Sequence, residues 1–379
     1  MILLLNYLKK ITYKQMIGYT ILFLLFASSL FFVHHNHSFY DRTIAQVFET
    51  SLVETTELID LYSNEDQLFI QEITAEVKNG EHKGERLKLT NQYSSSGAYD
   101  QQYQIGNELF VWIDPNTLDS DILNGTIEDV KRDKYLLLIT WIFIFTLLLV
   151  GKKQGLYSII SLIIIALLLS LALDLYVRTS NISLVLICGI AVILFTIISL
   201  LLVNGFNEKS YAAIVATLLG TFSILLITYI VISFTSGRGL RYEEMQFLTR
   251  PHEMVFMAGV LVGSLGAVMD VAITMSSSLF GLYEKNNTIS NKALKKSGME
   301  IGKDIMGTMT NILFFAYISG SIPMLILYLN NASPLGYTFS INLSLELARA
   351  LAGGIGIVLA IPIGLYITIF FINRKRAKR

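Results

Sequence analysis

A carboxylic acid stands near the middle of an apolar run that is long enough to cross a membrane. Asp270 lies in the run 254–280, and a charged side chain at the bilayer centre costs at least ~2.5 kcal/mol by insertion scales. Such residues usually face a cavity or a partner. Helical spacing places small and polar residues on roughly the same face as Asp270, with two serines beyond them: Gly259, Gly263, Ala267, Thr274, Ser277 and Ser278. Two interpretations stay open, a close helix contact around a protonated or hydrogen-bonded Asp and a proton or cation site.

The next apolar run, 306–329, is preceded and entered by polar residues that share one helical face. They follow one another at i, i+4, i+8 and i+11: Glu300, Asp304, Thr308 and Asn311. Favourable charge at a helix N-terminus explains the two acids without any further function, whereas Asn311 lies deeper. The segment 319–323 then interrupts the run, as in helices that line transporter cavities. A proline kink packed against neighbouring helices explains this break equally well.

The last apolar run, 345–371, opens with two opposite charges. Glu346 and Arg349 are three residues apart, a spacing at which helical side chains can pair. A structural ion pair near the outer interface, with Arg349 snorkelling, is one interpretation; a gate or a substrate contact is the other. Six residues are therefore candidates for transport or coupling: Asp270, Ser277, Asp304, Asn311, Glu346 and Arg349.

The sequence lacks the motifs of the common enzyme classes. It has no His-Glu-x-x-His, P-loop, Gly-x-Ser-x-Gly or dinucleotide fingerprint, and its one cysteine excludes an intrachain disulfide. His34, His35 and His37 stand beside Asp41 and could bind a transition metal, but a short histidine cluster at a helix end is more often incidental. We predict no enzyme activity, no cofactor, no metal site and no nucleic-acid partner.

The composition of the chain indicates that these residues are held by helices in a lipid membrane. Hydrophobic residues make up 53% of the 379 and charged residues only 15%, against about 25% charged in an ordinary soluble protein. The chain has too little charge to coat a soluble core, so lipid must be the solvent for much of its surface. Eight apolar runs approach spanning length: 16–33, 135–150, 156–173, 182–203, 211–234, 254–280, 306–329 and 345–371.

The distribution of Lys and Arg predicts the orientation. With the N-terminus inside, the cytoplasmic segments hold 16 basic residues and the short outer loops hold four, in line with the positive-inside rule. The first run follows three lysines and lacks a clear cleavage site, so we interpret it as an uncleaved signal anchor. We expect a multi-pass protein of the cell membrane with both termini in the cytoplasm.

The long segment 34–134 is then extracytoplasmic. It carries a net charge of −11, most simply the mark of a solvated surface. The part 43–66 could be strand or helix, but from Phe69 apolar and polar residues alternate between turn signals, which predicts four or five short strands. A small β-barrel or barrel-like sheet, with an OB-type barrel as one candidate, fits this pattern.

The sequence thus predicts an α-helical polytopic membrane protein of about eight transmembrane helices with a small extracytoplasmic all-β domain. Four parts follow along the chain: a cytoplasmic N-terminus with a signal-anchor helix (1–33), the β domain (34–134), a seven-helix membrane domain (135–372) and a basic cytoplasmic tail (373–379).

Several segments resemble the YibE/F family of multi-span bacterial membrane proteins. The most specific are 300–311, Glu-Ile-Gly-Lys-Asp-Ile-Met-Gly-Thr-Met-Thr-Asn, and 316–323, Ala-Tyr-Ile-Ser-Gly-Ser-Ile-Pro. The segments 266–278, 350–356 and 129–133 support it. Lys303 and Gly354 differ mildly from the pattern, where Arg and Ser are more usual. The resemblance implies a topology and membership of the family. It implies no particular biochemical activity, because none is established for the family.

For function we expect a permease-like protein that moves an ion or small solute, coupled to protons through Asp270. The alternative is a non-catalytic envelope or assembly factor whose extracytoplasmic domain binds a partner. Besides the lipid bilayer, the expected partners are an ion or small solute and a second copy or a related membrane protein.

Overall fold

A computed structural model describes residues 13–97, 100–117, 122–179, 182–245 and 251–378. Some of the basic residues whose distribution predicts the orientation lie outside these ranges: Lys9, Lys10, Arg250 and Arg379. The chain divides into two compact units, Met1–Thr146 and Leu147–Arg379. Each unit is described by itself.

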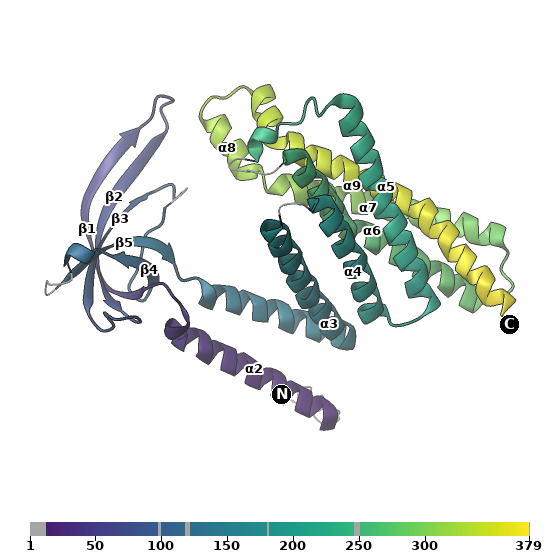
Figure 1. Ribbon diagram of the computed structural model, residues 1–379, viewed down its shortest axis with the longest axis horizontal. Helices are drawn as coiled ribbons and strands as arrows, with labels where there is room; N and C mark the ends of the chain where they lie inside the picture. The colour runs from purple at the N-terminus through teal and green to yellow at the C-terminus, as the bar shows by residue number, and fades with distance from the viewer. Residues whose placement is uncertain (1–12, 98–99, 118–121, 180–181, 246–250, 379) are drawn as a thin grey trace, which may run out of the picture. The chain divides into compact units, whose positions relative to one another are not determined.

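The first unit contains an apolar helix and a closed five-stranded barrel (Figure 1). Helix α2 (Tyr13–His35) and a short turn of 3-10 helix, η1 (His37–Phe39), precede the strands. The barrel order is β1-β2-β3-β5-β4, antiparallel except for the parallel pair β3–β5. The strands are β1 (Ile44–Ile59), β2 (Glu65–Val77), β3 (Arg86–Ser94), β4 (Glu108–Ile113) and β5 (Leu123–Val130); a second 3-10 turn, η2 (Pro115–Thr117), follows β4. The predicted small all-β domain is therefore present, and residues 43–66, whose pattern fits either strand or helix, are mostly strand.

The alternation of more and less buried side chains along the strands explains the barrel core. Ile73, Ala75 and Val77 of β2 are buried, and the residues between them are half-buried. Ile73 pairs with Leu89 and Ala75 with Leu87 of β3, which are also buried. Because successive side chains point to opposite faces of a strand, each strand contributes one apolar row to the interior. The barrel thereby has its own hydrophobic core.

A buried cluster of charges joins the base of the barrel to the two helices of this unit. Lys131, after β5, is almost fully buried and lies 3.0 Å from Glu108 of β4 and 2.9 Å from Asp133 at the start of α3 (Asp133–Arg178). Its ammonium also donates to the carbonyl of Val33 in α2, at 3.1 Å. Lys134 lies 2.7 Å from Glu108. The cluster therefore ties α2, the barrel and the start of α3 together.

The second unit is helical. It comprises the rest of α3, then α4 (Leu184–Asn204), α5 (Glu208–Thr235), the 3-10 turn η3 (Tyr242–Glu244), α6 (His252–Lys285), α7 (Asn291–Ser319), α8 (Ile322–Asn330) and α9 (Leu335–Ala377). Buried residues of α5, α6 and α9 form most of its core, with α7 packed against α6 and α9. Small residues bring the helices close, since a Cβ added at Gly356 of α9 would collide with Ile224 of α5.

Within the described residues, five helices are long and apolar enough to cross a membrane, and six if the bent pair α7 and α8 counts as one span. The runs 135–150 and 156–173 lie in a single helix, α3, whose backbone is non-helical at Lys152. The apolar part of α2, Thr20–His35, is shorter than these spans. The chain is a helical membrane protein with a small β domain, and these helices by themselves do not establish eight crossings.

Candidate functional site

Helix α6 has one exposed, mostly small and polar stripe. Gly263, Gly266, Asp270, Thr274 and Ser277 are exposed, whereas the residues on its other sides are buried against α4, α5 and α9. The Asp270 carboxylate has no hydrogen bond or ion pair with any residue that the structure describes. Asp270 is exposed on the surface of α6, and the described residues form no helix contact around its carboxylate.

Helix α7 turns its polar face outward in the same way. Asp304, Thr308 and Asn311 are exposed, while Gly298, Gly302 and Leu313 are buried. A Cβ added at Gly302 would collide with Ile361 of α9, so the glycines fix which side of α7 packs and which side stays open.

Two contacts show which residues of the α6 stripe and of the exposed face of α7 lie at the same level along the helix axes. Added Cβ atoms at Gly263 of α6 and Gly298 of α7 would meet Tyr317 of α7 and Leu279 of α6, respectively. The two helices therefore run antiparallel, and a rise of about 1.5 Å per residue puts Asp270 at the level of Thr308. An added Cβ at Gly266 or Gly307 meets nothing within 4 Å, so open space flanks both helices at this level.

A second polar group lies farther along α6. Arg349 and Glu346 of α9 form the ion pair that their spacing predicts, and the Arg349 guanidinium lies 5.5 Å from the centre of the Phe256 ring in α6. The hydroxyl of Tyr317 is buried without a hydrogen-bond partner among the described residues. It occupies the space that a side chain at Gly263 would take. Seven residues, about 10 Å of helix, separate Gly263 from Asp270.

The predicted site residues lie in three places. Asp270 and Ser277 lie in the exposed stripe of α6, and Asp304 and Asn311 lie on the exposed face of α7. Glu346 and Arg349 form an ion pair on α9. Sequence reasoning missed Tyr317, because a tyrosine in an apolar run is typical of core or interface packing. The glycine stripe of α6 was the available signal, since a missing side chain on one helix makes room for a large one on the next.

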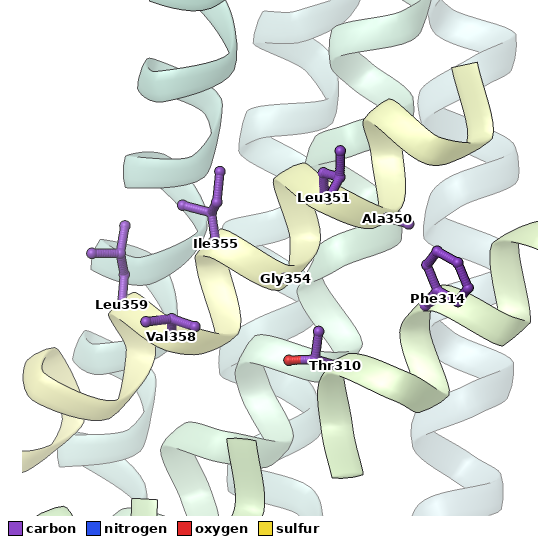
Figure 2. A pocket seen from close by; sticks show the side chains of 8 residues that line it. All are labelled: Thr310, Phe314, Ala350, Leu351, Gly354, Ile355, Val358 and Leu359. Carbon is purple, nitrogen blue, oxygen red and sulfur yellow. The ribbon is translucent and has the colours of Figure 1, made fainter. Parts of the chain in front are cut away.

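A cavity of about 340 Å³ lies between α7 and α9. Figure 2 shows Thr310 and Phe314 of α7 facing the α9 residues that line it. Thr310 is the only lining residue with a polar side chain; the others are Ala350, Leu351, Gly354, Ile355, Val358 and Leu359. Asp270 does not line this cavity, so the carboxylate belongs to the surface of the helices and not to this apolar space.

The histidine cluster does not converge. The rings of His34 and His35 contact carbonyls of the preceding helical turn at 2.8 and 2.9 Å, and His37 lies 3.3 Å from Glu108. Among the described residues, no group of three His, Cys, Asp or Glu side chains is arranged to hold a metal ion.

Comparison with known families gives two matches. Residues 38–130 match the YibE/F family N-terminal domain, and residues 139–374 match the YibE/F-like protein family. Comparisons with curated proteins and with solved structures find no match. The two family matches cover the barrel and nearly the whole helical unit. The chain therefore belongs to the YibE/F family.

Proposed function

We propose that this protein is a permease-like membrane protein that moves an ion or small solute and uses Asp270 as a proton or cation site. One observation carries the proposal. Asp270 stands on the exposed face of a membrane-spanning helix, without a partner among the described residues, where an unpaired carboxylate is costly unless water, a cation or a second protein surface reaches it.

The surrounding residues suit such a path. Ser277, Thr308 and Asn311 lie on the exposed faces of α6 and α7, and their oxygens can replace water around a cation or a polar solute that moves along these faces. At the other end of the glycine stripe, Arg349 and Glu346 supply a fixed charge pair, and Tyr317 supplies a hydroxyl that no described residue hydrogen-bonds. A second copy, or a related membrane protein, placed over the stripe would give the path its other wall.

The proposal includes the membrane arrangement. If α3 crosses twice about Lys152, if α7 with α8 crosses once and if α2 crosses, the total is eight, with both termini in the cytoplasm and the barrel outside. The closed order β1-β2-β3-β5-β4 with its parallel β3–β5 pair supports an OB-type barrel.

Flux in reconstituted vesicles tests the function. Asp270→Asn keeps the shape of the side chain and removes its ionisable proton, so the variant should insert and melt normally but lose proton or cation flux measured with an entrapped dye. Asp174→Asn is the matched control, because Asp174 is exposed near the end of α3 and pairs with Arg178. Equal flux in wild type, the control and Asp270→Asn would overturn the proposal.

The alternative, an envelope or assembly factor, is favoured by a different observation. The β1–β2 hairpin of the barrel carries a group of exposed apolar side chains, which is typical of a protein-binding element. Normal complementation of a deletion strain by Asp270→Asn would favour this alternative.

A further inference from the structure

The β1–β2 hairpin extends beyond the barrel (Figure 1). Strand β1 pairs with β2 along its whole length, but with β4 only at Ile44, Ala45 and Gln46. Backbone hydrogen bonds with Gly106 and Asn107 continue that edge to Val47. From Phe48 to Ile59, no described residue pairs with the outer side of β1, which leaves an open edge of about 40 Å.

This open edge has bulges and charged side chains but lacks the other usual protections. Exposed edges are commonly short, bear lysine or proline, or are covered, because unpaired N–H and C=O groups recruit other strands. Two bulges interrupt β1, after Val47 and after Leu52, but beyond the second the ladder is regular through Ile59. Ile59 is 69% exposed and Leu61 in the hairpin turn fully exposed. Further exposed apolar side chains follow the same hairpin: Leu52, Val53, Leu58 and Tyr62.

The charge of the hairpin restricts what can bind it. Residues 43–77 contain eight Asp and Glu and no Lys, Arg or His. An anionic lipid surface is repelled by this charge, and a second acidic hairpin is repelled as well. The acids are spread along both strands, and among the residues with described positions no three are arranged to hold a metal ion. A basic partner is the complementary one.

We propose that the free edge of β1 at 54–59 binds an extended, basic segment of another protein by strand addition. Main-chain hydrogen bonds to the edge would supply affinity. Lysine or arginine side chains would pair with Glu54 and Glu57, and apolar side chains would cover Leu58, Ile59 and Leu61. Asp66, near the base of the hairpin turn, stays charged because hydrogen bonds from the Ser95 and Ser96 hydroxyls lower its pKa to about 2. This inference does not depend on transport, and it gives the partner-binding alternative a specific surface.

Binding of synthetic peptides to the full chain in neutral-lipid nanodiscs tests the proposal. Glu54 and Glu57 lie on opposite faces of β1, so a peptide of alternating lysine and valine presents its lysines to one of the two glutamates. It should bind, and its affinity should fall as salt is added. The same peptide with every main-chain nitrogen methylated keeps its charge but cannot donate main-chain hydrogen bonds, and it should bind at least about tenfold more weakly. Equal binding of the two peptides, or no binding of the lysine–valine peptide, would overturn strand addition.

Charge reversal locates the surface. The double variant E54K/E57K should weaken lysine–valine binding by about tenfold or more. The double variant E72K/E128K changes the charge equally at exposed positions outside 54–59, one in β2, where Glu72 has ladder neighbours on both sides, and one in β5. It should change binding by less than about threefold. Equal weakening by both would show diffuse attraction and overturn the assignment to this edge.

Amide hydrogen exchange on the wild type gives a readout that does not depend on variants that fold. Bound lysine–valine peptide should slow exchange at 54–59 and leave exchange in β4 and β5 unchanged. Protection elsewhere without protection at 54–59 would overturn the proposal.

Discussion

The two units differ in whether their notable charged side chains have partners of opposite charge. At the base of the barrel, Lys131 and Glu108 are buried and every charge has an opposite charge within about 3 Å. On α6, Asp270 is exposed and has no partner among the described residues. Burying a charge is tolerated when it is paired and hydrogen-bonded, so the first group holds structure together. Because no described residue pairs with Asp270, this acid does not hold the described helices together, which makes it the better candidate for function.

The largest effect is expected from breaking the buried cluster. Lys131→Met removes the ammonium that Glu108, Asp133 and the Val33 carbonyl share, and it leaves two carboxylates near each other. Loss of one partner of a buried pair costs about 3–5 kcal/mol, so we expect strong destabilisation of the first unit in denaturant unfolding. Arg132→Met, at an exposed pair 3.9 Å from Asp129, should cost less than about 1 kcal/mol. Similar stability of the two variants would contradict a structural role for the cluster.

Acid should weaken the same cluster without any substitution. Burial alone would raise the pKa of Glu108, but hydrogen bonds from Lys134 and Lys131 outweigh it and hold the pKa below its ordinary 4.5. A carboxylate whose pKa is lowered in the folded state stabilises the fold above its unfolded pKa. That stability is lost as the pH falls below 4.5 and through the lower folded value. Thermal melting of the wild type should therefore drop over this range, and in Glu108→Gln the drop should be smaller.

The contact between α6 and α7 offers an intermediate effect. Gly263→Ala would collide with the Tyr317 hydroxyl, and overpacking of this kind costs about 1–3 kcal/mol. Tyr317→Phe should restore most of that stability, because it removes the oxygen that the new methyl group meets. Gly266→Ala has open space and should be neutral or slightly stabilising. A double-mutant cycle on the melting of purified protein measures the coupling, and a value near zero would contradict this packing.

The sequence predicted the elements better than it predicted their contacts. Alternation at Phe69–Val77 and the turn signals after it indicated the sheet, because burial on one face of a strand leaves a period of two. The helical spacing of Glu346 and Arg349 likewise predicted their ion pair, since both residues lie on one helix. The parallel β3–β5 pair and the buried role of Lys131 depend on residues far apart in the chain, and no local pattern shows them.

The candidate site was predictable in part for the same reason. The face of α6 that carries Asp270 follows from the spacing within one helix, and the structure exposes that face. Whether Asp270 is covered depends on which helices pack beside α6, which periodicity does not encode. Tyr317 became visible only through its contact with Gly263.

The smallest stability effect is expected at Asp270 itself. Because the carboxylate is exposed and makes no contact with a described residue, Asp270→Asn should change the free energy of unfolding in detergent by no more than about 0.5 kcal/mol. A cost near that of Lys131→Met would mean that Asp270 has a partner in the membrane, such as a second copy, and cross-linking through Thr274→Cys in a Cys188→Ser background would then identify it. An unchanged free energy of unfolding together with lost flux is the result that distinguishes a functional acid from a structural one.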